Sequence, residues 1–387
     1  MTFLISKKRT TLNLFLLFIV AFALRLVFIY PQFSGDVKNH IAWGESLLTS
    51  GPAGFFSRHF PGYNDANYPA LTIYFFGICR WFYHLSTNFI FWQNFNAKFL
   101  PSFLVPLFAS QNMEAAFMKL PSVLADLGIG ALIFAYFMKK NQKQAWLWTC
   151  LYLFNPAVIY VSAVWGQIES IPVFFMILSY FFLTSKNKNS YLYSHLSFTL
   201  GLLSKQTALW LTPVFLILWW KEGGTKKLLL GLLSQFILFI VLYLPFTNPS
   251  GAVFSYLITL VGSSSNLTDQ AFNLWYFIYG WSQKTDQTLL LGLTVRSWSI
   301  ALVSLTYIAA CLHFWKKYRL ENGPLYLFLL SIFAFFFQTR VHDRHLAPAI
   351  PFLILISLST KKKLPVYLAL SAFHMINLYL ALRLPFL

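Results

Sequence analysis

The chain has 387 residues, of which 58% are hydrophobic, 20% aromatic and only 10% charged. A soluble domain uses about a quarter of its residues as charged side chains, so these proportions exclude a water-soluble protein and predict an integral membrane protein. The formal net charge of +18 suggests nucleic acid as a partner, but the basic residues form short clusters between long apolar runs, and this excludes a basic groove. No strand-like alternation persists, so we expect an all-α fold.

At about 20 apolar residues per crossing, we expect about eleven transmembrane helices in a single domain, residues 1–387. The first span is expected at 11–30. Its apolar run is too long for a signal peptide, so we expect it to remain uncleaved. The other spans are expected at 117–138, 145–163, 168–185, 191–205, 207–220, 228–246, 289–315, 323–338, 346–360 and 364–382.

Two longer loops separate some of these spans. The first loop, 31–116, contains apolar stretches at 68–85 and 99–110 that prolines interrupt, and these predict interfacial or re-entrant helices. The second loop is 247–287. No internal repeat is visible, which argues against a transporter built from inverted repeats.

Charge predicts the orientation of the spans. If the N-terminus is cytoplasmic and the spans alternate, every inner segment is basic, as the positive-inside rule requires. Nine of the eleven acidic residues, all except Glu222 and Glu321, then fall outside or near the outer end of a span. The inner basic residues are Lys7, Lys8, Arg9, Lys139, Lys140, Lys143, Lys186, Lys188, Lys221, Lys226, Lys227, Lys316, Lys317, Arg319, Lys361, Lys362 and Lys363.

The first candidate site follows the first span. On a helix, Asp36, His40 and Trp43 share one face at spacings of four and three residues. A carboxylate at the outer surface can take a proton from a sugar hydroxyl, which predicts a general base at Asp36. The alternative is that Asp36 or Ser34 simply caps this helix.

Other charged residues lie in or beside apolar runs. Asp126 lies inside a predicted span, and a structural pair with Arg25 is the expected explanation. Lys205 departs from the positive-inside trend on the outer side, which an anionic ligand explains. Glu169 follows an outer turn, where the alternative is an interfacial carboxylate without a role.

The segment 339–345 ends a span on the outer side. Its Arg340, His342 and Arg344 suit a phosphate, because arginine presents a planar fork of donors to phosphate oxygens. The histidines also suggest a metal, but no set of carboxylate partners is local, and the three cysteines have no metal-site spacing. We therefore predict no metal site and no cofactor, with a divalent metal as the open alternative.

Further short motifs occupy the same predicted face. They are Gly35-Asp36, Tyr68-Pro69-Ala70-Leu71, Asn155-Pro156, Trp165-Gly166-Gln167-Ile168-Glu169, Lys205-Gln206, Asn273-Leu274-Trp275 and His342-Asp343-Arg344-His345. In this order, over Arg25 to about Pro348, the chain resembles the GT-C superfamily of polyprenyl-phosphate-sugar-dependent glycosyltransferases. The nearer likeness is to bacterial mannosyltransferase-like members and to dolichyl-phosphate-glucose glucosyltransferases. Glu169 replaces an aspartate of the family pattern, and the motif at 342–345 has two changes.

The resemblance implies a GT-C-like fold and an inverting hexosyltransferase at the extracytoplasmic face. It would move mannose or glucose from a polyprenyl-phosphate donor to a lipid-linked or glycan acceptor, with Asp36 as general base. Charge and the family pattern together predict phosphate-binding and substrate-binding residues. Those predicted for the donor phosphate are Lys205, Arg340, His342 and Arg344, and those predicted to contact substrate are His40, Tyr68, Gln167, Glu169, Gln206, Trp275 and Asp343.

Two alternatives to a transferase stay open. A lipid-linked-sugar flippase or another transporter would also have many helices and buried charge, and a non-enzymatic assembly subunit would need neither Asp36 nor the phosphate cluster. Membrane lipids are expected neighbours in every case, and nucleic acid in none. Short loops favour a prokaryotic plasma membrane over the endoplasmic reticulum.

Overall fold

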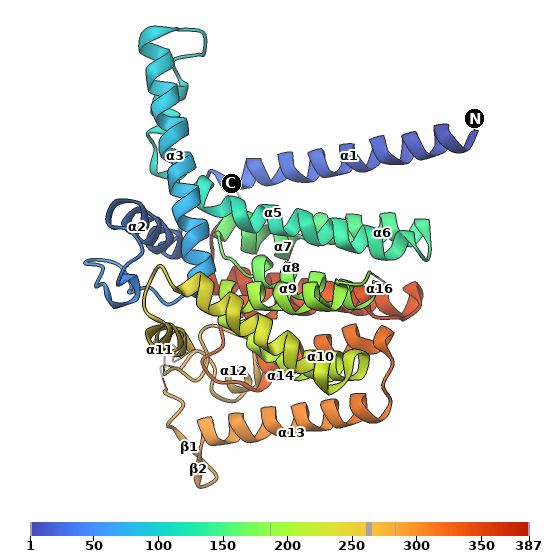
Figure 1. The fold of residues 1–387 in the computed structure, drawn as a ribbon. Helices are drawn as coiled ribbons and strands as arrows, with labels where there is room; N and C mark the ends of the chain where they lie inside the picture. The colour runs from blue at the N-terminus through green and yellow to red at the C-terminus, as the bar shows by residue number, and fades with distance from the viewer. Residues whose placement is uncertain (1, 186, 261–264, 283, 386–387) are drawn as a thin grey trace.

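The computed structural model describes residues 2–185, 187–260, 265–282 and 284–385, and it is almost entirely helical (Figure 1). Lys186 and residues 261–264 and 283 of the predicted second loop lie outside the described residues. The first nine α-helices are α1 (Thr2–Ile29), α2 (Gly35–Ser50), α3 (Ala70–Asn96), α4 (Leu104–Phe108), α5 (Gln111–Met138), α6 (Gln142–Leu153), α7 (Pro156–Ile159), α8 (Ser170–Leu183) and α9 (Ser190–Ser204).

The second half of the chain continues the helical fold. Its α-helices are α10 (Thr212–Tyr243), α11 (Pro249–Leu260), α12 (Leu274–Tyr279), α13 (Val295–Lys316), α14 (Gly323–Phe337), α15 (Ala349–Leu355) and α16 (Thr360–Leu382). The shorter turns are η1 (Phe55–Ser57), η2 (Tyr160–Trp165), η3 (Gln206–Leu211), η4 (Leu320–Asn322) and η5 (Asp343–Leu346), of which η2 is π-helical and the others are 3₁₀-helical. The second predicted loop, 247–287, therefore contains two helices.

Among the described residues, six helical segments are long and apolar enough to cross a membrane. The bent pair formed by α6 with α7 and η2 makes a seventh if it is one span, with a bend of 45°. The six segments are Thr11–Ile29, Gln111–Met138, Gln206–Tyr243, Val295–Lys316, Leu320–Phe337 and Thr360–Leu382. These are the features of an integral membrane protein, while the eleven predicted spans are not confirmed.

The difference in number has local causes. Helices α8 and α9 have 14 and 15 residues, about 21–23 Å at 1.5 Å per residue, which is short of a hydrocarbon core about 30 Å thick. Helix α15 has only 7 residues and cannot form the predicted span 346–360. The predicted pair 207–220 and 228–246 is counted as one of the six segments, but it consists of two helices, because Gly224 between them has a non-helical φ of 66° and ψ of 178°.

The predicted span 289–315 starts too early. Strands β1 (Leu289–Leu290) and β2 (Leu293–Thr294) form an antiparallel hairpin before α13, with Leu289 opposite Thr294. Both turn residues, Leu291 and Gly292, have positive φ, at 51° and 82°. A two-residue turn of this kind matches the twist of paired strands, and glycine adopts such φ without steric cost.

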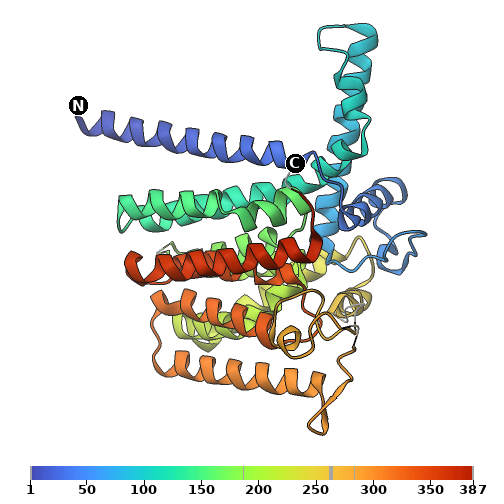
Figure 2. The same ribbon diagram turned by 180° about the vertical axis from the view of Figure 1, so that it is seen from behind.

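The bundle has two chemically different ends. Helices α1, α5, α6, α13 and α16 run along nearly the same direction, and the view from behind agrees (Figures 1 and 2). The N-terminus of α1, the α5–α6 turn and the α13–α14 connection lie together at one end. We call this the basic end, because it gathers lysines of residues 139–143, 221–227, 316–319 and 361–363. Helices α2 and α11 and the β-hairpin lie at the opposite end, which we call the site end.

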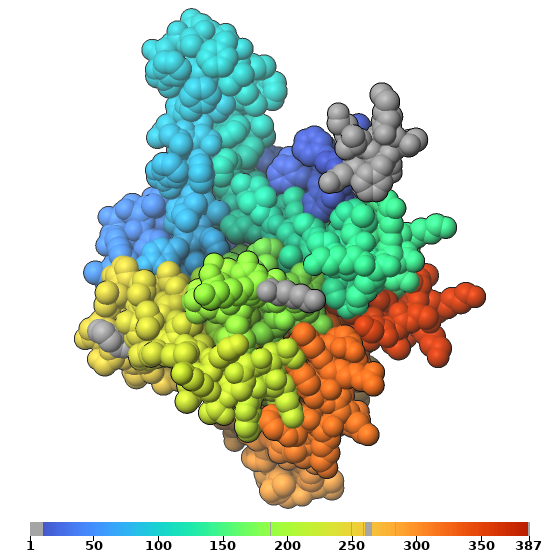
Figure 3. Space-filling view, turned by 45° about the vertical axis from the view of Figure 1, so that its right-hand side comes forward, coloured from blue at the N-terminus to red at the C-terminus, as the bar shows by residue number. Residues whose placement is uncertain are grey.

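Helix α3 stands across the bundle axis at the site end, and its distal half projects with α4 from the body (Figures 1 and 3). Its root is fixed, because the Thr72 hydroxyl donates to the Ser204 carbonyl oxygen and Arg80 pairs with Glu45 at 2.7 Å. Farther out, Trp81 and Trp92 are 51% and 54% exposed. Exposed aromatic side chains on a helix perpendicular to the spans favour the predicted interfacial position, although α3 extends beyond the predicted 68–85.

The predicted structural pair is confirmed inside the bundle. Nε of Arg25 on α1 lies 3.3 Å from Oδ2 of Asp126 on α5, and both side chains are fully buried. Arg25 also donates to the Leu153 carbonyl oxygen at 2.9 Å. The hydroxyls of Ser162 and Ser170 each donate to Asp126 at 2.5 Å. This pair joins α1, α5 and the segment that carries the candidate site.

Candidate functional site

Asp36 lies in the first turn of α2 without capping it. Ser34 is the cap, because its Oγ accepts from the Val37 backbone N–H at 3.3 Å. The same hydroxyl donates to the Trp165 carbonyl oxygen at 2.8 Å. Of the two capping alternatives, the structure therefore assigns Ser34, and the Asp36 carboxylate is left for other contacts. A carboxylate in the first turn is also stabilised by the helix dipole.

Two side-chain N–H groups hold the Asp36 carboxylate. Trp165 Nε1 donates to Oδ2 at 3.0 Å, and Gln167 Nε2 donates to the same oxygen at 2.5 Å. Both donors flank Gly166, whose φ of 85° makes the sharp turn at the end of η2. A Cβ at Gly166 would come within 2.5 Å of the Val37 side chain, so only glycine lets the two segments approach this closely.

Lys119, on α5, stabilises the same turn at Gly166. Its Nζ donates to the carbonyl oxygens of Ile29 at 2.9 Å, Gln32 at 2.7 Å and Val164 at 2.9 Å. The ammonium thus ties α5 to the end of α1, to the segment leading into α2 and to η2. Lys119 is a positioning residue for Asp36, although it does not contact the carboxylate in these hydrogen bonds.

A second group of charges lies beside Asp36. Glu169 Oε1 accepts a hydrogen bond from Lys205 Nζ and lies 3.3 Å from Arg344 Nε. The three side chains are buried, and Glu169 Oε2 has no hydrogen-bond partner among the described residues. We call Glu169, Lys205 and Arg344 the buried triad. These residues come from three separate segments, so their proximity is a product of the fold.

Two aromatic residues connect the triad with Asp36. The Arg344 guanidinium carbon lies 4.8 Å from the centre of the Trp165 ring, whose N–H donates to Asp36. Lys205 Nζ lies 5.3 Å from the centre of the Tyr68 ring. Aromatic faces stabilise cations at such distances when water is excluded. Trp165 therefore contacts both the carboxylate and the triad.

The charges set the protonation of the site. Burial raises the pKa of Asp36, but the Arg344 guanidinium, together with His40, the Trp165 hydrogen bond and Lys205, outweighs burial and holds this pKa below its ordinary value. Burial lowers the pKa of His40 to about 3, against the opposing effect of Asp36. At neutral pH the site thus holds an ionised Asp36 and a neutral His40. His40 stacks on Phe76 with ring centres 4.3 Å apart, so it also packs α2 against α3.

Asp343 behaves differently from Asp36. Its side chain is buried, and burial raises its pKa to about 8 although Arg344 opposes this. Asp343 Oδ1 lies 4.0 Å from Arg344 Nη1, and its Oδ2 has no hydrogen-bond partner among the described residues. At pH 7 the carboxyl group therefore keeps its proton and is a potential donor beside the triad.

This difference predicts a dependence of stability on pH. Between about pH 4 and pH 8 an unfolded chain has lost the Asp343 proton while the folded chain keeps it, so the free energy of unfolding falls as pH rises across this window. Asp343→Asn should remove that fall, on the order of a few kcal/mol. Thermal unfolding in detergent, followed by tryptophan fluorescence, checks whether the difference between variant and wild type grows from pH 4 to pH 8. A difference that is independent of pH would contradict the prediction.

Two of the residues predicted to bind the donor phosphate contact other side chains in the structure. Arg340 Nε pairs with Asp286 at 2.7 Å, and the Arg340 backbone has a positive φ of 63°. His342 Nε2 lies 3.8 Å from an oxygen of Asp269, and its backbone N–H donates to His345 Nδ1 at the start of η5. Of the four predicted phosphate residues, the structure brings Lys205 and Arg344 together at Glu169.

Of the residues predicted to contact substrate, some also lie at the site and others lie in structural contacts elsewhere. Tyr68 and Gln167 lie at the site, as described above. Gln206 follows Lys205 in sequence, and its Nε2 donates to the Thr259 carbonyl oxygen at 3.0 Å. Trp275 donates to the Phe337 carbonyl oxygen at 2.9 Å and packs in a separate hydrophobic cluster. Asn155 caps α7 and donates to Tyr367, so its motif has a structural explanation.

Sequence reasoning missed the roles of Trp165 and Lys119. The signal for Lys119 was a lysine inside an apolar span, which needs a polar partner in lipid. Trp165 gave no comparable signal, because an aromatic residue at a helix end is common in membrane proteins. Within the described residues, no group of three or more His, Cys, Asp or Glu side chains is placed to hold a metal ion.

No protein-family model matches the chain, and no curated protein matches it significantly. The elements of the site are an ionised carboxylate at the start of α2, held by two N–H donors, and two cations that are held by Glu169 and whose charge acts on this carboxylate. All of them lie at the site end of a bundle of apolar helices.

Proposed function

We propose that this protein is a membrane glycosyltransferase of the GT-C type. It transfers a hexose, mannose or glucose, from a polyprenyl-phosphate donor to a lipid-linked or glycan acceptor, with inversion at the anomeric carbon. The observation that carries this proposal is the contact of Trp165 with both Asp36 and Arg344, which sets a base beside a cationic group. A base and an anion-binding group at one site are what displacement of a phosphate by a hydroxyl requires.

Asp36 acts as the general base in this proposal. Trp165 and Gln167 both donate to Oδ2, so Oδ1 is available for an acceptor hydroxyl. The hydroxyl oxygen forms a bond to the anomeric carbon, its proton passes to Asp36, and the electron pair of the breaking bond leaves on the phosphate oxygen. The low pKa of Asp36 means that the proton transfers late, as the attacking hydroxyl becomes acidic.

Lys205 and Arg344 bind the leaving phosphate. Glu169 holds both cations, but an ammonium has three N–H donors and a guanidinium has five, so donors remain for phosphate oxygens. These donors are fixed before substrate arrives and lie in a buried environment, where charge stabilisation is strongest. The protonated Asp343 would add a neutral donor beside them. Arg340 would have no part in phosphate binding, because it pairs with Asp286. His342 would still be in reach of the phosphate, because burial and then the charges of the neighbouring Arg344 and Lys205 lower its pKa and leave a neutral ring beside both cations.

The membrane context supports the same substrates. The site end is the end without the lysine clusters, so the positive-inside rule puts it at the extracytoplasmic face, with a cytoplasmic N-terminus. A polyprenyl chain can lie in the bilayer while its phosphate reaches the site at the end of the spans. The exposed aromatic residues of α3 suit the headgroup level of the same leaflet. A prokaryotic plasma membrane is the proposed location.

A donor panel in reconstituted vesicles tests the function. The purified protein is incubated with polyprenyl-phosphate mannose or glucose, each labelled in the sugar, and with membrane glycolipid acceptors. We expect label to move into a lipid-linked or glycan product from one of these donors, and not in protein-free vesicles. Movement of intact donor across the bilayer without a product would contradict the transferase and support a flippase, the alternative that shares buried charge and many helices.

A further inference from the structure

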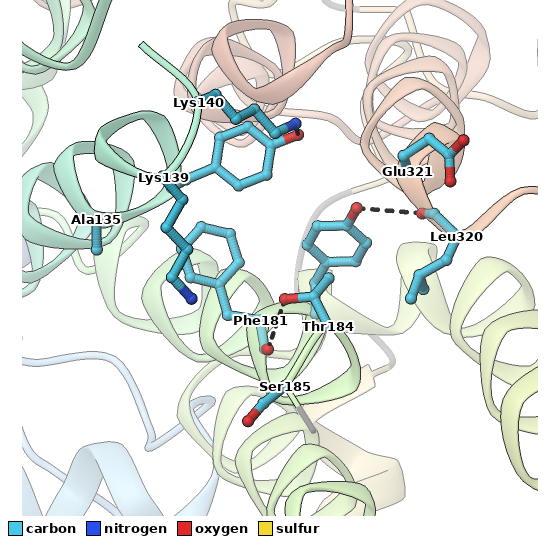
Figure 4. A pocket seen from close by; sticks show the side chains of 10 residues that line it. Ala135, Lys139, Lys140, Phe181, Thr184, Ser185, Leu320 and Glu321 are labelled. Atoms are coloured by element: carbon cyan, nitrogen blue, oxygen red, sulfur yellow. Dashed lines mark hydrogen bonds between the residues drawn. The ribbon is translucent and has the colours of Figure 1, made fainter. Parts of the chain in front are cut away.

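A cavity of about 300 Å³ opens at the basic end, far from the candidate site (Figure 4). The C-terminal ends of α5 and α8 and the turn η4 form its walls. Its volume is at the lower end of the range for small-molecule sites. Because it lies at the ends of apolar helices, it is at the level where lipid headgroups meet the protein.

Hydrogen bonds between separate elements hold the walls in place. The Tyr180 hydroxyl on α8 donates to the Leu320 carbonyl oxygen of η4 at 3.1 Å. The Tyr136 hydroxyl on α5 donates to the Leu355 carbonyl oxygen at 3.2 Å and accepts from Lys140 Nζ at 2.8 Å. The cavity is thus formed by fixed elements, and its tyrosine hydroxyls already have donors or acceptors within the protein.

The charges at the cavity have opposite signs and do not neutralise one another. Lys139 lies on the α5 side and Glu321 on the η4 side, and Figure 4 shows them on opposite walls. Neither forms an ion pair within 4.0 Å among the described residues. Lys140 and Ser185 also line the cavity, and Figure 4 shows them at its two opposite ends, with Lys140 bonded to the Tyr136 hydroxyl. A ligand with one negative and one positive group would match this arrangement.

We propose that this cavity binds the phosphoethanolamine headgroup of a membrane phospholipid. The phosphate lies on the Lys139 side of the cavity, and the ammonium lies at Glu321. A basic pocket at the end of membrane helices suits a phosphate-bearing headgroup, and the carboxylate disfavours headgroups that carry only negative charge. The acyl chains extend along the apolar outer face of α5, where Leu124 and Met138 are exposed.

Lipid binding to the purified full-length protein in detergent tests this site. Phosphatidylethanolamine, phosphatidylglycerol and soluble glycerophosphoethanolamine are titrated separately, and binding is measured by native mass spectrometry. We expect phosphatidylethanolamine to bind about fivefold more tightly than phosphatidylglycerol, the scale of one exposed ion pair. Equal binding of the two lipids would overturn the proposal. Binding of the soluble headgroup as tightly as the lipid would overturn the membrane lipid as its source.

Exposed residues at the cavity allow variants that keep the fold. Glu321→Gln should remove the preference for phosphatidylethanolamine, and Lys139→Gln should weaken binding of both lipids by about fivefold. Glu222→Gln and Lys143→Gln are matched controls, because both residues lie at the basic end but do not line the cavity. A Glu321→Gln protein with unchanged preference would contradict the ammonium contact. The readout is lipid binding, so it is independent of glycosyl transfer.

Discussion

Replacing Asp36 with asparagine is expected to lower the rate of sugar transfer by about 10²–10⁴-fold, the contribution of a positioned general base. Asparagine can still accept hydrogen bonds from Trp165 and Gln167 through its amide oxygen, so the turn at the site should keep its geometry. It cannot accept the proton of the attacking hydroxyl. The rate is measured in single turnovers with saturating donor, and donor affinity should change by less than about threefold because the triad is intact.

Asp65→Asn is the matched control for Asp36→Asn. Asp65 belongs to the same long loop, its side chain is 63% exposed, and it contacts His59 at 3.1 Å. We expect its transfer rate to equal that of the wild type. Full turnover by the Asp36→Asn protein, with a donor that the wild type uses, would remove Asp36 from the mechanism. An equal loss in both variants would instead indicate a general effect of the loop.

Some of the fold could be predicted because the physics is local or compositional. The apolar composition and the lysine clusters predicted a membrane protein with one basic end, and the structure gathers those clusters at one end of the bundle. The Arg25–Asp126 pair could be predicted because two opposite charges in apolar spans must find each other. The predicted apolar stretch 68–85 begins close to the start of α3 at Ala70, directly after Pro69.

Other features depend on distances that the sequence does not contain. Trp165 and Asp36 are 129 residues apart, and their contact depends on the turn at Gly166 and on three carbonyl groups held by Lys119. Arg340 looked equivalent to Arg344, because charge alone cannot show that Asp286 neutralises one of them. Apolar runs predicted additional spans because a buried short helix and a membrane span have the same composition.

Replacing Asp126 with alanine is expected to lower the free energy of unfolding by about 3–5 kcal/mol, the cost of leaving a buried charge without its partner. Arg25 is fully buried, and Asp126 is its only ion-pair partner among the described residues. The variant also removes the acceptor of the Ser170 hydroxyl and one of the two acceptors of the Ser162 hydroxyl, which keeps the Val158 carbonyl oxygen. Unfolding by sodium dodecyl sulfate, added to mixed micelles and followed by tryptophan fluorescence, measures the change.

The double variant Arg25→Met with Asp126→Leu separates the cost of a lone charge from the value of the pair. Removing both charges should restore most of the stability, because apolar side chains of similar volume often replace a buried pair at little cost. Asp65→Ala removes an exposed carboxylate and should change stability by less than about 1 kcal/mol. A single Asp126→Ala variant as stable as the wild type would show that Arg25 reaches another acceptor. If the double variant also transfers sugar at the wild-type rate, the buried pair supports the bundle, and the reaction depends on Asp36 and the triad.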